Sequence, residues 1–197
     1  MKTVFFDVDT QIDFMYPAGA LYAPGAERIL PLIARLNQQA ADSGAVVISS
    51  MDAHSENDPE FREWPPHCVV GTVGQQKPAS TLLAKRIVIP TAEVAERIDG
   101  YQQILLEKQH LDAFTNSNLR WILEALDADR YVVYGVVTEY CVRLAAFGLL
   151  KTGKQVEIVT DAIRSLNESD GERVLNEFKA AGGALTTSAA LLNAPAG

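Results

Sequence analysis

Cysteine is scarce in this chain, with Cys68 and Cys141 the only two among 197 residues. Two thiols cannot form a disulfide framework, so reduced cysteines and a cytoplasmic location are expected. No stretch approaches the roughly 18 uninterrupted apolar residues that a transmembrane helix requires. The apolar run near the N-terminus is interrupted by Asp7 and Asp9, so we expect no signal peptide.

Positive charge is also in short supply. Lysine and arginine number 17 against 25 aspartates and glutamates, which gives a net charge of −8. This balance argues against nucleic acid or an anionic membrane surface as the main partner. Hydrophobic residues make up 48% of the chain, enough for a full core. Because no repeat or linker-like stretch interrupts it, we expect one domain over residues 1–197.

Short β-branched and aromatic runs alternate with segments of helical spacing. The runs typical of strands cover residues 4–6, 46–48, 87–89, 104–106, 131–137 and 156–159. The segments with helical spacing cover residues 26–41, 118–126, 138–150 and 169–181. This alternation predicts an α/β three-layer sandwich, a mostly parallel sheet of about six strands with helices on both faces. In such folds ligands bind beyond the carboxyl ends of the strands.

Three of the predicted strands lead into residues that can carry chemistry. Asp9 follows the first strand, Lys108 follows the fourth, and Cys141 lies in the first turn of the helix after the fifth. The start of a helix favours the reactive thiolate form of a cysteine. Singly, Asp9 fits a turn cap equally well, Lys108 is more typical of a solvated lysine, and Cys141 is more typical of a buried thiol. Together they predict an acid/base, a cation and a nucleophile at one sheet edge.

A second cluster follows the strand at 46–48. Asp52 and His54 are two residues apart, so in an extended chain they face the same side and can hold one ion, with His67 as a third ligand from the next loop. Imidazole and carboxylate suit Zn, Mn, Fe or Co. The alternative is a set of ordinary polar loop residues. The same loop offers three acidic candidates for a fourth or outer ligand, and the sequence does not choose among them: Glu56, Asp58 and Glu60.

These residues lie in motifs that resemble the isochorismatase-like cysteine hydrolases, and within them the nicotinamidase branch. The resemblance extends from Val4 to about Leu192. Its motifs are Asp9-Thr10-Gln11-Ile12-Asp13-Phe14, Glu107-Lys108, Gly135-Val136-Val137-Thr138-Glu139-Tyr140-Cys141-Val142 and Trp64-Pro65-Pro66-His67-Cys68-Val69.

The resemblance implies a role for each matching residue. It implies a catalytic triad of Asp9, Lys108 and Cys141, and an oxyanion hole formed by the backbone N–H groups of Val137 and Cys141, with a cis peptide between Val136 and Val137. It also implies one divalent metal ion, zinc with manganese or iron as alternatives, which orients the substrate through its ring nitrogen. The implied metal ligands are Asp52, His54 and His67, and the implied substrate contacts are Phe14 and Trp64.

The implied reaction converts nicotinamide, or a similar small carboxamide, to the acid and ammonia through a thioester on Cys141. The alternative substrates are an N-carbamoyl compound, ureidoacrylate or isochorismate, and a less favoured alternative is a non-catalytic protein that binds metal or ligand. Relatives often self-associate, so a homo-oligomer is expected. One departure from the family pattern is Glu139, where relatives often have aspartate.

Overall fold

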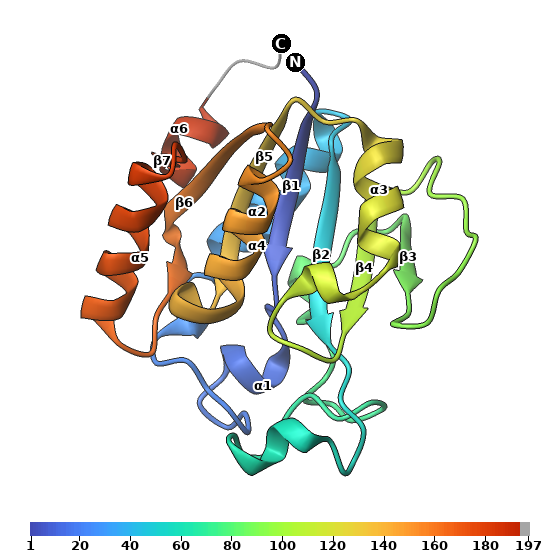
Figure 1. Ribbon diagram of the computed structural model, residues 1–197, viewed down its shortest axis with the longest axis vertical. Coiled ribbons are helices and arrows are strands. Elements are labelled where there is room, and N and C mark those ends of the chain that lie inside the picture. Colours follow the sequence, from blue (N-terminus) through green and yellow to red (C-terminus); the bar gives the residue numbers. More distant parts are fainter. Residues whose placement is uncertain (194–197) are drawn as a thin grey trace.

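The computed structural model describes residues 1–193, which form a sheet of seven parallel strands in the order β3-β4-β2-β1-β5-β6-β7 (Figure 1). The strands are β1 (Thr3–Val8), β2 (Val46–Asp52), β3 (Arg86–Ile89), β4 (Gln103–Lys108), β5 (Arg130–Val136), β6 (Gln155–Arg164) and β7 (Ala184–Thr186). All six expected strands are present. The sequence did not predict β7, because this three-residue edge strand is half exposed and offers no long apolar run.

Helices cover both faces of the sheet, which confirms the three-layer sandwich (Figure 1). One face is covered by α3 (Asn118–Leu126), α4 (Arg143–Leu150) and α5 (Glu168–Ala180), and the other by α2 (Leu30–Asp42) and α6 (Ser188–Leu192). The remaining elements are short: α1 (Ile12–Met15), η1 (Ala26–Arg28), η2 (Pro59–Arg62), η3 (Ala79–Thr81), η4 (Ala113–Thr115) and η5 (Thr138–Val142). None of the helices within residues 1–193 has the length and apolar character needed to cross a membrane.

Two of the expected helices are divided. The segment 26–41 consists of the 3₁₀ turn η1 followed by α2, which has Pro31 in its first turn, where a missing N–H costs nothing. The segment 138–150 begins with the π-helical turn η5 and continues as α4. In η5 the N–H of Val142 donates to the carbonyl of Val137, five residues earlier.

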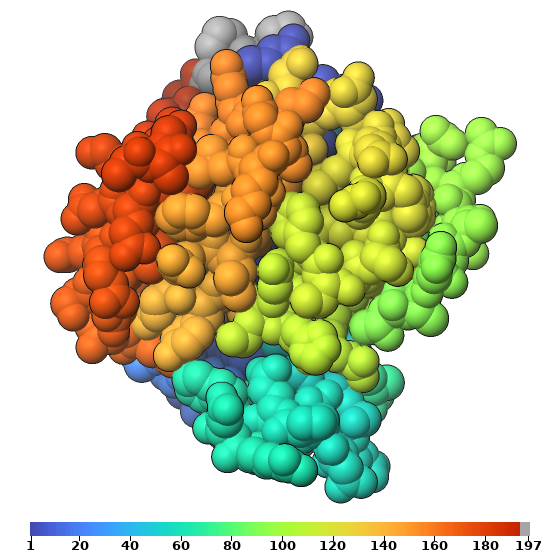
Figure 2. All heavy atoms as spheres, in the orientation of Figure 1, coloured from blue at the N-terminus to red at the C-terminus, as the bar shows by residue number. Residues whose placement is uncertain are grey.

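Alternate side chains of the central strand enter different cores. Val4, Phe6 and Val8 of β1 pack under α3 and α4, whereas Phe5 packs on the α2 side. Both faces of the strand are therefore buried, which explains its continuous apolar run. The strands point their carboxyl ends to one edge, and the segment around η2, teal in Figure 2, projects there. The candidate catalytic and metal-binding side chains lie at this edge of the sheet, close to that segment.

We predict that Gly135→Ala will destabilise the fold strongly. Gly135 has φ +120° and pairs with Val8, and an added Cβ would lie 2.1 Å from the Val8 carbonyl oxygen. The expected loss in the free energy of unfolding is about 2–4 kcal/mol, measured by urea denaturation. Gly153→Ala is the matched control, because Gly153 also has positive φ but open space around it, and should cost about 1 kcal/mol. Equal losses would refute the close-approach argument.

Candidate active site

Register places the candidate residues at one edge of the sheet. Asp52 and Lys108 are paired residues at the ends of the neighbouring strands β2 and β4. Asp9 follows β1 with φ +48°, a left-handed conformation that aspartate tolerates better than most residues. Its N–H donates to the Ser50 carbonyl and its Oδ1 accepts a 2.7 Å hydrogen bond from the Ser50 hydroxyl. Cys141 comes from η5, after β5.

Lys108 is the centre of this cluster. Its buried ammonium lies 2.9 Å from Asp9 Oδ2, forms an ion pair with Asp52 Oδ1, and lies 3.7 Å from the Cys141 sulfur. The structure therefore brings Asp9, Lys108 and Cys141 together. The contact with Asp52 was not foreseen, because the sequence indicated Asp52 only as a metal ligand.

Burial and charge pull the ionisation of these groups in opposite directions. Burial disfavours the charge on Lys108, but Asp52 and Asp9 raise its pKa well above the ordinary value. Burial also disfavours the Asp52 carboxylate, but Lys108 and His54 hold its pKa at about 2. For Asp9, burial prevails and raises the pKa, although Lys108 opposes the shift. Lys108 and Asp52 thus stay ionised, and Asp9 is the more easily protonated carboxylate.

Two opposing effects set the ionisation of Cys141. The start of a helix favours a thiolate, but burial and the nearby carboxylates raise the pKa of Cys141 well above its ordinary value, and Lys108 only partly opposes them. The cost of burying a charged thiolate exceeds the stabilisation that the start of the helix provides, because Cys141 is only 7% exposed. The sulfur is therefore a neutral thiol at rest and needs a base to become a nucleophile.

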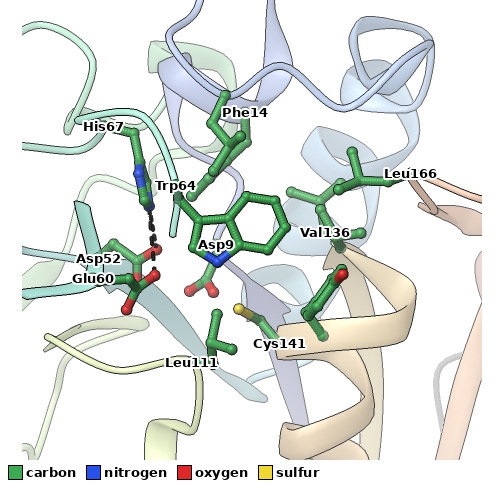
Figure 3. A pocket seen from close by; sticks show the side chains of 13 residues that line it. Asp9, Phe14, Asp52, Glu60, Trp64, His67, Leu111, Val136, Cys141 and Leu166 are labelled. Carbon is green, nitrogen blue, oxygen red and sulfur yellow. Dashed lines mark ion pairs between the residues drawn. The ribbon is translucent and has the colours of Figure 1, made fainter. Parts of the chain in front are cut away.

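Cys141 and Asp9 open onto a pocket with mostly apolar walls (Figure 3). Phe14 and Trp64 line it, as expected, and the Trp64 ring meets the Tyr140 ring edge-on at a centroid distance of 5.4 Å. Val137 and Cys141 also border the pocket, and the Val136–Val137 peptide is cis, as the resemblance implied. The sequence did not identify four other lining side chains, of which only Tyr140 lies within a quoted motif: Leu21, Leu111, Tyr140 and Leu166.

The predicted metal ligands are brought together beside this pocket. Asp52, His54 and His67 are all buried, and their ligand atoms lie within 4.8 Å of one another. An isolated parallel bridge between His54 and Val69 joins the end of β2 to the loop that carries His67. Asp52 Oδ2 lies 3.8 Å from His54 Nε2 and 3.9 Å from His67 Nε2. Such spacing leaves room for one ion between the three side chains.

The imidazoles are oriented to bind a cation. His67 Nδ1 lies 2.8 Å from the Pro65 carbonyl, which can only accept, so Nδ1 carries a proton and Nε2 is the nitrogen that faces Asp52. His54 Nε2 is buried and has no hydrogen-bond partner within residues 1–193. A buried nitrogen without a partner is costly in a protein interior. The donor set therefore fits a divalent metal ion.

The three acidic candidates occupy different positions. Glu60 Oε1 lies 3.9 Å from His67 Nε2, on the metal side of that ring, and Glu60 lines the pocket (Figure 3). Asp58 Oδ2 lies 3.1 Å from His54 Nδ1, the nitrogen on the opposite edge from Asp52. Glu56 is exposed. Of the three, Glu60 is thus the one near the His67 nitrogen that faces Asp52, whereas Asp58 lies near the outer nitrogen of His54, and neither belongs to the Asp52, His54 and His67 cluster.

Comparison with known proteins agrees with this geometry. The isochorismatase domain matches residues 3–190. The nicotinamidase of Escherichia coli (strain K12) is 27% identical, with 92% of this chain and 93% of the relative covered. The zinc complex of a pyrazinamidase from Pyrococcus horikoshii superposes with a TM-score of 0.79 at 28% identity, covering 95% of this chain and 99% of that one. An N-carbamoylsarcosine amidase from Thermoplasma acidophilum, at 24% identity and a TM-score of 0.76 over 95% and 97% of the two chains, shares the fold.

A parallel α/β sandwich with a buried cysteine, lysine and aspartate at the strand ends defines the class as a hydrolase. The chain belongs to the isochorismatase family, and its curated relatives place it in the nicotinamidase branch of that family, among the amidohydrolases.

Proposed function

We propose that the protein hydrolyses nicotinamide, or a similar small heteroaromatic carboxamide, to the carboxylic acid and ammonia. One observation carries the proposal: the Asp9–Lys108–Cys141 cluster opens onto the same pocket as the Asp52 and His67 side chains. The pocket has aromatic walls at Phe14 and Trp64 that suit a flat ring. The Asp9–Lys108–Cys141 cluster would carry out the hydrolysis, and the metal site would bind the substrate ring at a second point.

In the proposed mechanism Asp9 takes the proton from the Cys141 thiol, and the sulfur attacks the carboxamide carbon. The backbone N–H groups of Val137 and Cys141 donate to the oxyanion that forms. The C–N bond then breaks as Asp9 passes its proton to the leaving amine, which departs as ammonia. Asp9 next takes a proton from water, whose oxygen attacks the thioester carbon; the C–S bond then breaks, Asp9 returns the proton to the departing Cys141 sulfur, and the acid is released. Lys108 stays charged throughout and offsets the negative charge on sulfur and carboxylate.

A divalent ion at Asp52, His54, His67 and Glu60 would supply a Lewis acid for the ring nitrogen of the substrate. Phe14 would pack against the substrate ring at the same end, because it lies beside His67 at a ring-centroid distance of 5.4 Å. Zinc is the proposed metal, with manganese and iron as alternatives.

The alternative substrates fit the pocket less well. Ureidoacrylate and isochorismate carry carboxylates, as do many N-carbamoyl compounds, and these need a cationic partner. Within the described part of the chain, the lining side chains include three acidic residues and neither arginine nor lysine. Lys108 lies beneath them and is already paired with two carboxylates. A neutral carboxamide is therefore favoured. The single-domain organisation, the cytoplasmic location and the homo-oligomer stay predictions.

The purified protein should release ammonia from nicotinamide, and Cys141→Ala should abolish this release. The loss is expected because no other group in the pocket can form the thioester. Cys68→Ala is the matched control, since it removes the other buried thiol, and it should retain activity. Ammonia release by Cys141→Ala would contradict the nucleophile assignment. Inactivity toward nicotinamide, with hydrolysis of an N-carbamoyl compound, would favour that alternative substrate.

The rate should fall in acid as Asp9 becomes protonated. Because its pKa is raised, the acid limb of kcat/KM should lie above the ordinary aspartate value of about 3.9. The Ser50 hydroxyl donates to the Asp9 carboxylate and stabilises its charged form. Ser50→Ala should therefore raise the pKa of Asp9 and move the acid limb upward by about one pH unit. Ser49→Ala, which removes a hydrogen bond to Asp7 instead, should leave the limb in place. If the acid limb of kcat/KM lies at the same pH in the parent protein, Ser50→Ala and Ser49→Ala, Asp9 is not the base that titrates.

Metal affinity should distinguish the acidic residues of the loop. Glu60→Gln should weaken zinc binding by about tenfold or more, whereas Glu56→Gln should leave it unchanged. Competition against a chromophoric chelator, after metal removal with EDTA, measures the affinity without reference to turnover. His54→Ala should weaken it further, because a buried ligand is lost. Equal affinities for the Glu56 and Glu60 variants would remove Glu60 from the ligand set.

A further inference from the structure

An exposed leucine lines the pocket at a loop between two elements. Leu166 lies between the end of β6 and the start of α5, is 38% exposed, and borders the same pocket as Val136 and Cys141. Figure 3 shows it on the opposite side of the pocket from His67 and Asp52. A single exposed leucine is unremarkable by itself. Its backbone contacts are what distinguish it.

The backbone of this loop is fixed by the turn that carries Cys141. Glu139 precedes Cys141 by two residues in η5, and its Oε1 accepts hydrogen bonds from the N–H groups of Leu166 and Asn167, both at 2.9 Å. Hydrogen bonds to a carboxylate are stronger than those between neutral groups. Glu139 therefore ties the outer wall of the pocket to the element that positions the sulfur.

The other side of the loop is fixed by α5. Asn167 caps the helix, and its Oδ1 accepts from the N–H groups of Ser169 and Asp170. At Gly171, in the first turn, an added Cβ would lie 2.1 Å from the Ser165 hydroxyl oxygen. The loop thus packs directly on the helix while Glu139 holds its inner side. Leu166 is left with little freedom to move away from the pocket.

We propose that Leu166 is a specificity-determining residue that limits the size of the substrate on this side, and that Glu139 is a positioning residue that acts through it. The proposal rests on the proposed function for its substrate class, a small ring carboxamide. Unsubstituted rings fit under Leu166, whereas rings with a bulky group directed at the β6–α5 loop are excluded. Glu139 sets the position of this contact because one of its carboxylate oxygens accepts hydrogen bonds from two consecutive N–H groups of the loop.

The first test compares kcat/KM for nicotinamide with that for nicotinamides carrying ethyl or phenyl groups on the ring. Leu166→Ala should raise the ratio of substituted to unsubstituted substrate by about tenfold or more, and Leu166→Phe should lower it. Glu139→Ala should raise the ratio as well, and Glu139→Gln, which keeps an accepting oxygen, should match the parent. The double variant Leu166→Ala/Glu139→Ala should equal Leu166→Ala alone, because both act on one wall. Glu172→Ala, an exposed change on α5, is the control.

A second test separates this proposal from the proposed function. In a Cys68→Ala background, Cys141 is the one thiol of the chain, and mass spectrometry can follow its conversion to a mixed disulfide by methyl or benzyl methanethiosulfonate. The benzyl-to-methyl rate ratio should rise in Leu166→Ala and in Glu139→Ala, whether or not nicotinamide is a substrate. An unchanged ratio in Leu166→Ala overturns the proposal. A Glu139→Ala variant that is slower with every reagent and substrate, at an unchanged ratio, overturns the positioning role. A parent inactive on nicotinamide and on other small heteroaromatic carboxamides rejects the proposed function alone.

Discussion

The site depends on one buried cation. Lys108 is enclosed at the carboxyl edge of the sheet and pairs with Asp9 and Asp52, which come from different strands. Removing three charges from water costs several kcal/mol per ion, and only close pairing offsets that cost. The pairing requires the parallel register in which Asp52 lies beside Lys108 and Ser50 reaches Asp9. The register of β1, β2 and β4 is therefore a condition for the ionisation states on which the proposed chemistry relies.

Asp52 connects two parts of the site that the sequence presents as separate. One carboxylate oxygen contacts Lys108, and the other faces His54 and His67. Its pKa of about 2 keeps it available as an anionic ligand. A cation held by the imidazoles would compete with Lys108 for the same carboxylate charge, because both draw on one side chain. The metal cluster and the proposed triad are thus electrostatically coupled through a single residue.

Much of this arrangement could be predicted from the sequence because it follows from strand ends. Parallel strands buried on both faces read as apolar runs, and their carboxyl ends meet at one edge, which is sufficient to bring Asp9, Lys108 and Cys141 together. The contact between Lys108 and Asp52 depends on register, which no apolar run specifies. Which acidic residue of the 55–63 loop comes near the imidazoles depends on the path of an irregular loop. Leu166 is held by a hydrogen bond that its backbone N–H donates to Glu139, and a leucine in the sequence carries no sign of it.

The charge on Cys141 is set by two opposing effects, and their balance bears on the proposed mechanism. A helix start favours a thiolate, yet burial keeps the thiol neutral. When the proton moves from sulfur to Asp9, the negative charge moves in the opposite direction, so the total charge of the buried cluster does not change. Lys108 lies 2.9 Å from Asp9 Oδ2 and 3.7 Å from the sulfur, close enough to stabilise the charge at either position. In a medium of low dielectric, such a transfer avoids the cost of creating or removing a net charge. A neutral resting thiol is therefore compatible with a reactive one, provided that the base and the cation stay in contact.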